Sequence, residues 1–224
     1  MERAPGRLIG SGRHADVYEL GADRVLRRYR TAQQAGPEAA LMEHVRAHGF
    51  PAPEVFAADG GDLVMQRVDG PSLLHVMSQA PHRLGRLAAL LAELHHRLHE
   101  IPAPPGTARP VGSGDAVLHL DLHPANVVVT PDGPVVLDWG WAGAGPADAD
   151  AAHTWLQMAT SEVPGGAFVR AMGAVGRRLL VRQFLSHFDR PRLVAHLDAV
   201  AAYRLAVRDL TEGERARIPR FVRS

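Results

Sequence analysis

Three polar side chains in one short stretch have the types and spacing that phosphoryl transfer needs. The segment His119–Asn126 reads H-x-D-x-x-x-x-N, and a hydrophobic run after it ends in the D-x-G sequence that begins at Asp138. In this chemistry an Asp accepts the proton of the attacking hydroxyl, while an Asn and a second Asp hold magnesium ions on the phosphates. The spacing therefore predicts Asp121 as the catalytic base and Asn126 and Asp138 as Mg²⁺ ligands.

A predicted hairpin must bring the two metal ligands together. Val127–Val129 and Val135–Leu137 read as strands, and Thr130–Gly133 between them has turn chemistry. Asn126 precedes the first strand and Asp138 follows the second, so we expect both at one end of the hairpin. Mg²⁺ prefers oxygen ligands, usually one or two carboxylates together with substrate phosphates.

A glycine-containing turn near the start of the chain could cover the phosphates of a nucleotide. Gly10, Ser11 and Gly12 open a G-x-G-x-x-A pattern that ends at Ala15. Glycines allow backbone N–H groups to approach phosphates closely. A dinucleotide-binding unit would need a helix directly after the glycines. Ala15–Leu20 reads as a strand instead, which favours a glycine-containing hairpin.

Two further segments could complete a nucleotide site. Arg27 lies on a predicted strand after the glycine-containing turn, where a kinase has the cation that contacts phosphate. Glu38 lies at the start of the next predicted helix and could orient the Arg27 side chain. Backbone groups around Gln66 and Val68 could pair with an adenine edge. Taken alone, Arg27 reads as an exposed strand arginine and Glu38 as an acid favoured by the helix dipole. Their order along the chain favours the functional interpretation.

Composition excludes several classes of protein. The chain has 224 residues and no cysteine, so disulfides and thiolate chemistry are excluded. The first residues lack the apolar core of a signal peptide, and no apolar run is long enough to cross a bilayer. We therefore expect a cytoplasmic protein without a membrane partner, either a monomer or a dimer. All 25 cationic residues are arginine, so lysine cannot serve at any catalytic position.

Charge is distributed unevenly along the chain. Residues 1–150 carry 13 arginines and 18 acids, a net of −5, whereas residues 151–224 carry 12 arginines and 6 acids, a net of +6. The basic part could meet an anionic partner, but solvated helix faces are the simpler interpretation. The arginines are scattered and lack interleaved aromatic residues, so we do not expect nucleic-acid binding.

The pattern changes from strands to helices at Val68–Pro71, which predicts an N-terminal lobe over 1–68 and a C-terminal lobe over 69–224. The strands expected in the first lobe are Arg7–Gly10, Ala15–Leu20, Arg24–Arg30, Glu54–Ala58 and Asp62–Arg67, with one helix over Pro37–His48. The helices expected in the second lobe are Ser72–Ser78, His82–Glu100, 147–160, 165–188 and 191–210, with a loop over Pro102–Asp115 and an irregular tail from Thr211.

These blocks together resemble the aminoglycoside phosphotransferase/choline kinase family, the small-molecule branch of the protein-kinase-like fold. The segments that carry the resemblance are HLDLHPANVVV, VVLDWG, IGSGRHADVYEL, VLRRY, EAALMEHVRAHGFPAPEV and LVMQRVDGPSL, which span residues 7 to about 155. The resemblance implies an α+β, two-lobed fold that binds ATP or GTP with Mg²⁺ and phosphorylates a hydroxyl of a small molecule. It also implies that His119 holds the catalytic loop and that Asp150 anchors or caps the following helix.

Two features of the sequence depart from this family. Arg27 stands where the family has lysine, and arginine differs from lysine in reach and geometry. This replacement leaves open a catalytically impaired nucleotide-binding protein or scaffold. The net basic C-terminal region contains few of the carboxylates that a polycationic acceptor would need, so a neutral or anionic acceptor is at least as plausible as a polycation.

A metal-dependent hydrolase is the remaining alternative. It would use His119, Asp121 and His123 as ligands, with histidines from His95–His99 added, since imidazole and carboxylate suit Zn or Fe. That interpretation leaves Asn126, Asp138 and the glycine turn unexplained.

Overall fold

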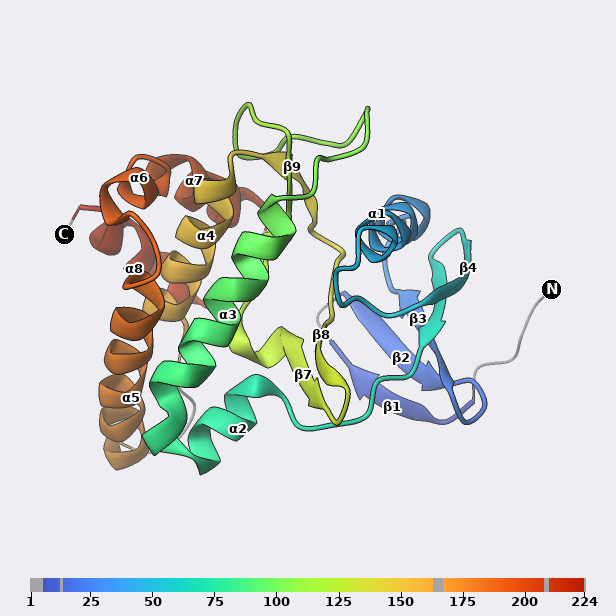
Figure 1. Cartoon of the computed structure of the whole chain (residues 1–224), viewed down its shortest axis with the longest axis horizontal. Coiled ribbons are helices and arrows are strands. Elements are labelled where there is room, and N and C mark those ends of the chain that lie inside the picture. The colour runs from blue at the N-terminus through green and yellow to red at the C-terminus, as the bar shows by residue number, and fades with distance from the viewer. Residues whose placement is uncertain (1–5, 13, 163–166, 208–209, 224) are drawn as a thin grey trace. The chain divides into compact units, whose positions relative to one another are not determined.

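The structure is a computed structural model that describes residues 6–12, 14–162, 167–207 and 210–223. It divides into two units (Figure 1): the first combines residues up to Ser72 with Asn126–Ala142, and the second combines Leu73–Ala125 with the residues from Gly143 onward. The hairpin expected to carry the metal ligands thus belongs to the first unit. The two units are each made of two segments of the chain, so the predicted boundary between an N-terminal lobe over 1–68 and a C-terminal lobe over 69–224 stays a prediction.

The first unit is built on a five-stranded antiparallel sheet with the order β1-β2-β3-β5-β4. Its strands are β1 (Leu8–Ser11), β2 (Ala15–Glu19), β3 (Arg24–Tyr29), β4 (Val55–Asp59) and β5 (Asp62–Gln66). The unit also contains α1 (Gly36–Ala47) and the hairpin of β7 (Val127–Thr130) and β8 (Gly133–Val136). The predicted small sheet with one helix is confirmed.

Helix α1 begins and ends where its sequence directs. Pro37 lies in the first turn, where its missing N–H costs nothing, and Gly49 follows the helix with a φ of +78°. The side chains that α1 buries recur at helical spacing and include Leu41, Met42 and Val45. Phe50 then packs edge-to-face on Trp139 of the D-x-G segment, which ties that segment into the core of this unit.

The second unit is mainly helical. Its helices are α2 (Leu73–Gln79), the 3-10 turn η1 (Pro81–Arg83), α3 (Leu84–His99), α4 (Ala147–Thr160), α5 (Ala167–Leu185), α6 (Arg190–Val194), α7 (Leu197–Val207) and α8 (Glu212–Val222). A second 3-10 turn, η2 (Pro124–Asn126), lies where the chain passes from this unit to the first. Strands β6 (Ala116–Leu118) and β9 (Gly143–Gly145) pair antiparallel.

Helix α4 forms the centre of the second unit. Almost every residue from Ala149 to Leu156 is buried, and α4 packs against α5, α6, α7 and α8 (Figure 1). The small residues Ala149, Ala151 and Ala152 allow these neighbours to approach closely. A helix that is buried on all sides can place polar side chains only where they find partners.

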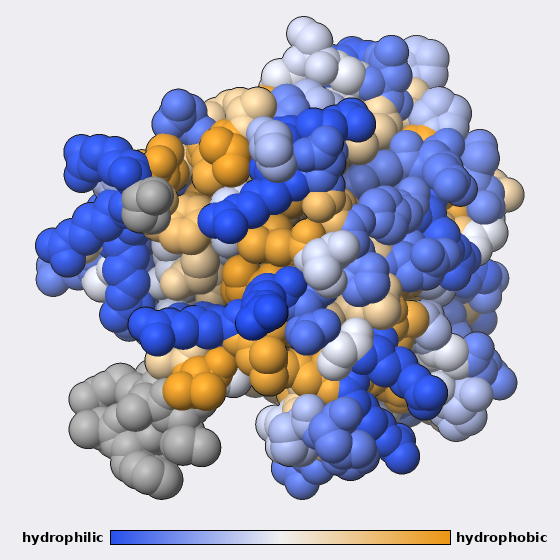
Figure 2. Space-filling model, turned by 60° about the vertical axis from the view of Figure 1, so that its left-hand side comes forward, coloured by the Kyte–Doolittle hydropathy of each residue, from blue (hydrophilic) through white to orange (hydrophobic). Residues whose placement is uncertain are grey.

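The outer helices carry the arginines of the basic region. Arg178 and Arg182 on α5 and Arg217 and Arg220 on α8 are exposed. Figure 2 turns the side with α5 forward and shows hydrophilic side chains interleaved with hydrophobic ones. This arrangement agrees with solvated helix faces. None of the helices that the structure describes is both long enough and apolar enough to cross a membrane.

Two predictions of secondary structure in the C-terminal part are wrong. The helix expected over 191–210 is interrupted after Val194 by a two-residue turn, and Asp198 lies in the first turn of the helix that follows, where its charge favours a new start. The tail from Thr211, expected to be irregular, forms α8. The start of the helix expected at 165 and the end expected near 210 fall partly outside the described residues.

The pairing of β6 with β9 was not expected, because β9 is rich in glycine, which weakens strand patterns. Close packing requires these glycines. A Cβ on Gly143 would lie 2.8 Å from the carbonyl oxygen of Ala108, and one on Gly145 would lie 2.7 Å from Leu118 Cδ1. The expected loop over Pro102–Asp115 contains no helix or strand in the structure.

Thr211 starts α8 through a capping box. Its hydroxyl accepts the N–H of Glu214 at 3.1 Å, and the Glu214 carboxylate accepts the N–H of Thr211 at 3.2 Å. We expect Thr211→Ala to destabilise α8 by about 1 kcal/mol, which corresponds to about fivefold faster amide exchange. Hydrogen-exchange mass spectrometry should find this increase over 212–222 and none over 84–99.

The control is Thr31→Ala, which removes an exposed threonine outside any helix. Equal exchange over 212–222 in Thr211→Ala and in the control would show that the capping box does not stabilise α8.

Candidate active site

The loop of the second unit that contains Asp121, the predicted catalytic base, is held by three polar side chains of α4. Asp150 Oδ1 accepts the N–H of Leu120 at 2.7 Å, and its Oδ2 accepts the N–H of His119 at 3.1 Å. Thr154 Oγ1 donates to the carbonyl oxygen of Leu122 at 2.8 Å. Gln157 Nε2 donates to Asp121 Oδ1 at 3.0 Å. The three side chains follow one face of α4 at i, i+4 and i+7, and we call them the α4 polar stripe.

The backbone of this loop is held in an uncommon conformation. Leu120 has a φ of +56°, which is costly for a residue with a branched side chain, and its side chain is fully buried. The Asp150 carboxylate stabilises this conformation because it binds the N–H of Leu120 and the N–H of the residue before it. Asp121, the next residue, is largely buried.

Asp150 does not cap its own helix, because the residue at the N-cap position is Pro146. Burial would raise the pKa of Asp150, but the neighbouring His95 and His99 hold it well below its ordinary value. An ionised carboxylate is the form that accepts two backbone N–H bonds. The expected anchoring role is therefore directed at the loop, and His119 takes part through its backbone N–H.

In the first unit, Arg27 joins the two carboxylates that the sequence analysis selected. Its Nη1 donates to Glu38 at 2.8 Å, and its Nη2 donates to Asp138 at 2.6 Å. Tyr29 donates its hydroxyl to the other oxygen of Glu38. The expected Arg27–Glu38 pair is confirmed as a contact, whereas the bond to Asp138 was not predicted. Arginine can form both because its planar guanidinium has separate donor nitrogens.

Arg27, Glu38 and Tyr29 are largely buried, whereas the Asp138 side chain is 40% exposed, and burial perturbs the pKa values of the first three. Burial alone would lower the pKa of Arg27, but Glu38 and Asp138 raise it, so the guanidinium stays charged. Burial raises the pKa of Glu38 against the attraction of Arg27. Burial and the Glu38 carboxylate also raise the pKa of Tyr29, so its hydroxyl remains a donor.

The D-x-G segment follows the predicted hairpin. Val127 pairs with Val136, and the N–H of Leu137 donates to the carbonyl oxygen of Asn126 at 2.8 Å, so Asn126 and Asp138 leave the same end of the ladder. Asp138 has a φ of +65°. Gly140 cannot carry a side chain, because a Cβ there would lie 2.6 Å from the Tyr29 hydroxyl.

The glycine turn is a hairpin, as expected. The N–H of Gly12 donates to the carbonyl oxygen of Ala15 at 2.9 Å, and β2 follows directly. Ser11 Oγ donates to Asp16 at 2.9 Å. A Cβ on Gly10 or Gly12 would make only ordinary contacts, at 3.6 Å and 3.4 Å. Packing inside the hairpin therefore does not explain why these two positions are glycine.

The two residues expected near adenine differ in their backbone environment. The N–H of Gln66 donates to the carbonyl oxygen of Glu54 at 2.8 Å, and Gln66 pairs with Arg24 in the sheet. Val68 lies beyond the last paired residue of β5. Of the two, Val68 is better placed to offer backbone groups to a ligand.

The ligand cluster of the hydrolase alternative does not form among the described residues. The His and acidic side chains that converge closely enough for a metal ion in that part of the chain are His95, His99 and Asp150. His123 Nε2 lies 4.0 Å from Asp121 Oδ1. The first unit thus brings together Arg27, Glu38 and the hairpin end, while Asp121 belongs to the second unit.

The sequence analysis did not select Gln157, Thr154 or Tyr29. A signal for the first two was present, because Asp150, Thr154 and Gln157 are polar residues at helical spacing in a helix that is rich in alanine and other apolar residues. Tyr29 gave no such signal, because a tyrosine at the end of a strand is common in sheet cores.

Comparison with solved structures finds the same fold. Aminoglycoside phosphotransferase APH(4)-Ia, as a ternary complex with AMP-PNP and hygromycin B, has a TM-score of 0.67 at 14% identity, over 97% of this chain and 92% of that one. A choline/ethanolamine kinase family protein from Mesorhizobium loti has a TM-score of 0.59 at 18% identity, over 97% and 86% of the chains. The predicted kinase-like fold is confirmed.

A curated protein also shows partial similarity. A probable bifunctional tRNA threonylcarbamoyladenosine biosynthesis protein from Methanosphaera stadtmanae is 23% identical over 154 residues. The match covers 61% of this chain and 26% of that protein, so this chain spans about a quarter of its length.

A family model described as the phosphotransferase enzyme family matches residues 5–115 and 107–193. The match includes the glycine turn, Arg27, the catalytic loop and the D-x-G segment, and it confirms the resemblance found in the sequence. The chain belongs to the phosphotransferase enzyme family.

Proposed function

We propose that the protein is a Mg²⁺- and ATP-dependent phosphotransferase that phosphorylates a hydroxyl group of a small molecule. The observation that carries the proposal is the pair of hydrogen bonds by which the Arg27 guanidinium joins the Glu38 carboxylate to the Asp138 carboxylate. It supplies an oriented cation beside the carboxylate of the D-x-G segment, which is what binding of a metal-bound triphosphate needs. Membership of the phosphotransferase family supports the same conclusion.

The nucleotide side of the reaction falls to the first unit. The backbone around Gly10, Ser11 and Gly12 would cover the phosphates, and the absence of any packing reason for the two glycines supports this role. Arg27 would contact a phosphate oxygen, with Glu38 fixing its orientation. Backbone groups near Gln66 and Val68 would bind the adenine. The solved neighbours with ADP or AMP-PNP favour an adenine nucleotide over GTP.

The residues at the hairpin end fit a magnesium ion. Asp138 is 40% exposed, and Arg27 bonds only its Oδ1, so Oδ2 is left for a cation. Asn126 would supply an amide oxygen from the same end of the hairpin. When bound, Mg²⁺ neutralises charge on the transferring phosphoryl group.

Asp121 would orient the acceptor hydroxyl and take its proton. The hydroxyl oxygen bonds to the γ-phosphorus as the bond from that phosphorus to the departing ADP oxygen breaks, and the hydroxyl proton passes to the carboxylate. The hydrogen bond from Gln157 to Oδ1 helps to fix the orientation of this carboxylate. The exposed arginines of α5 and α8 favour a neutral or anionic acceptor over a polycation.

One observation favours a second candidate, a nucleotide-binding protein with little catalytic activity. The Asp138 carboxylate, the proposed metal ligand, is already bound by the arginine that replaces lysine. Magnesium binding must then compete with a short charged hydrogen bond. Nucleotide binding without turnover on any acceptor would establish this candidate.

We expect Asp121→Asn to lower turnover by about 10²–10⁴-fold, because it removes the proton acceptor. Asparagine still offers Gln157 an acceptor oxygen, so the loop should keep its structure. The assay is ADP release with the best acceptor from a panel of neutral and anionic alcohols, beside calorimetric measurement of the Kd for Mg·ATP. Normal turnover in this variant would show that Asp121 is not the base.

Asp138→Asn should abolish the magnesium-dependent part of ATP binding. A ligand at a hundred times its Kd adds ~2.7 kcal/mol of stability, which thermal unfolding can resolve. Wild type should be stabilised more by ATP with Mg²⁺ than without it, and the variant should lose that difference. Asp132→Asn, in the exposed turn of the same hairpin, is the control. A full magnesium effect in Asp138→Asn would remove Asp138 from the metal site.

Arg27 can be tested with two substitutions. Arg27→Met leaves Glu38 buried without its charge partner, so we expect a loss of about 3–5 kcal/mol in unfolding free energy together with loss of ATP binding. Arg27→Lys should keep ATP binding because an ammonium group also binds phosphate, but it should lose stability because one nitrogen cannot bridge both carboxylates as the guanidinium does. Denaturant unfolding and calorimetry measure both effects. Unchanged ATP binding in Arg27→Met would contradict the proposed role.

A further inference from the structure

Three arginine side chains gather where helix α4 ends. Arg177 on α5 donates from its Nη1 to the carbonyl oxygen of Ser161, and Arg217 on α8 donates from its Nη1 to the carbonyl oxygen of Thr160 at 3.2 Å. Partial burial and the positive charges of Arg217 and Arg178 lower the pKa of Arg177. Two helices thus bring like charges together, and we call Arg177, Arg178 and Arg217 the arginine cluster.

The charge of the arginine cluster is not balanced by its surroundings. Glu162 Oε1 lies 3.4 Å from Arg217 Nη2, whereas no described carboxylate lies within ion-pair distance of Arg177 or Arg178. The C-terminal end of a helix carries about half a negative elementary charge, so together with Glu162 it supplies about 1.5 negative charges against three positive ones. An anion from outside the chain can supply the remainder.

Capping of α4 accounts for only part of this arrangement. Arginines near the end of a helix often bond its last carbonyl groups, as Arg177 and Arg217 do here. Arg178, in contrast, makes no hydrogen bond or ion pair with any residue that the structure describes. Arg177 is half-buried and uses one of its five N–H donors in a bond to a described residue. The planar fork of a guanidinium matches two oxygens of a phosphate or a carboxylate.

Helix α4 also links the arginine cluster to the predicted catalytic base. Ser161 follows Gln157 by four residues, which is a rise of about 6 Å in a helix, and its Oγ donates to the Gln157 carbonyl oxygen at 2.7 Å. Gln157 Nε2 in turn donates to Asp121 Oδ1 at 3.0 Å. All of these residues belong to the second unit. An acceptor whose hydroxyl lies at Asp121 can therefore extend a second group toward the cluster.

We propose that the arginine cluster binds an anionic group, a phosphate or a carboxylate, of the hydroxyl-bearing acceptor. Arg177 binds the oxygens through its fork, while Arg178 and Arg217 add the charge that favours an anion over a neutral or cationic group. The identity of the ligand as the acceptor rests on the phosphotransferase function proposed above, whereas the anion site itself does not.

The first test is a calorimetric titration of the full-length protein with inorganic phosphate. Saturating Mg·AMP-PNP is present, so that phosphate cannot bind where the nucleotide phosphates bind. Wild type should bind one equivalent, and Arg177→Gln should weaken the Kd at least about tenfold, because it removes charged hydrogen bonds to the anion. Arg178→Gln should also weaken it, and since Arg178 has no bond to a described residue, this variant keeps the fold intact.

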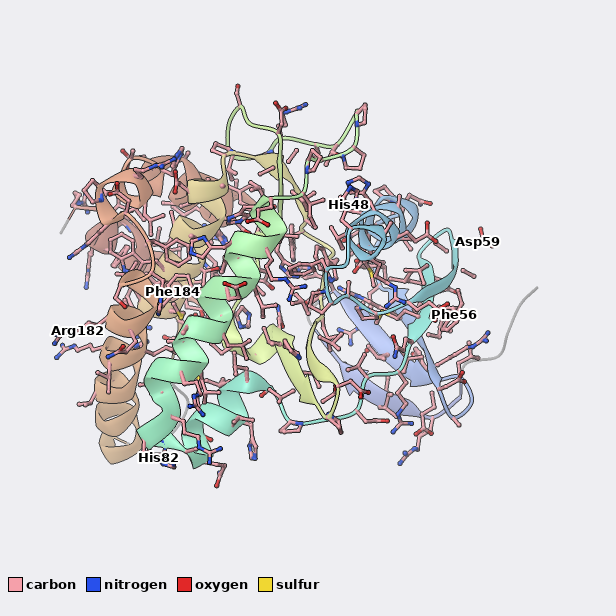
Figure 3. All side chains as sticks on the ribbon, in the orientation of Figure 1. His48, Phe56, Asp59, His82, Arg182 and Phe184 are labelled. Carbon is pink, nitrogen blue, oxygen red and sulfur yellow. The ribbon has the colours of Figure 1, made fainter. Side chains whose placement is uncertain are left out.

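The matched control is Arg182→Gln. Arg182, labelled in Figure 3, lies on the same helix as Arg177, and its exposed side chain extends away from the neighbouring helices. The control removes the same charge from α5 as Arg177→Gln does, so it should leave the Kd for phosphate within about twofold of wild type. It separates a localised anion site from general attraction by a basic surface.

The second test identifies the anion as part of the acceptor. ADP release is measured with sugars and polyols, each beside its monophosphate and its acid form, so that the comparison also separates phosphate from carboxylate. The anionic forms should be the better acceptors. Arg177→Gln should raise their KM at least about tenfold and keep kcat near that of wild type, because the cluster binds a group remote from the reacting hydroxyl.

Three results would overturn the proposal. Wild type that binds no phosphate, or Arg182→Gln that weakens binding as much as Arg177→Gln, would show that the arginines form no anion site. Neutral acceptors that react as well as their anionic forms, with a KM that Arg177→Gln does not change, would make phosphate an adventitious ion only. If wild type used no acceptor at all, the phosphotransferase function would fail, and the phosphate titration would still decide the anion site.

Discussion

The carboxylate of Asp150 is the group on which the conformation of the loop around Asp121 depends. It lies at the buried centre of the unit, accepts the N–H groups of His119 and Leu120, and contacts two histidines of α3. A buried ionised carboxylate is tolerated only when its hydrogen bonds are satisfied, and here those bonds fix a loop with positive φ at Leu120. The same two hydrogen bonds therefore compensate both the cost of burying the charge and the cost of the strained backbone, and Asp121 follows directly after the bend.

In the first unit the central buried charge is positive, whereas that of Asp150 in the second unit is negative. Arg27 is the buried cation, and Glu38, Asp138 and the Tyr29 hydroxyl arrange themselves around it. Because arginine spreads its charge over a planar fork, it can bind the carboxylates of Asp138 and Glu38 at once through separate nitrogens, whereas a lysine has a single nitrogen. The same fork ties Asp138 to the sheet before any metal is bound. This explains why the D-x-G glycine lies against Tyr29, with no room for a side chain.

Local rules predicted the elements that carry strong periodic or turn signals. The hairpin after Asn126, helix α1 with its proline and glycine ends, and the glycine hairpin were all found where expected. Strand β9 was missed because its glycines are required by close packing against Ala108 and Leu118, which are distant in sequence. Helix α8 was missed because its arginines and its internal proline obscure the apolar pattern. The spacing of Thr211 and Glu214 is nevertheless typical of a capping box at the start of a helix. Within the site, the sequence identified the motif residues and the Arg27–Glu38 pair, but not the contacts from Tyr29, Thr154 and Gln157.

The α4 polar stripe shows why those supporting groups escape a motif search. Asp150, Thr154 and Gln157 bind the loop mostly through its backbone, so the contact places no demand on which side chains the loop carries. Their trace in the sequence is polar residues spaced i, i+4 and i+7 in a helix that is mostly buried. In a helix that is buried on every side, each polar side chain needs a hydrogen-bond partner, and the backbone N–H and C=O groups of a neighbouring loop can supply one. Polar spacing inside a buried helix is thus a physical signal for the element that positions a catalytic loop, independent of the reaction that the loop performs.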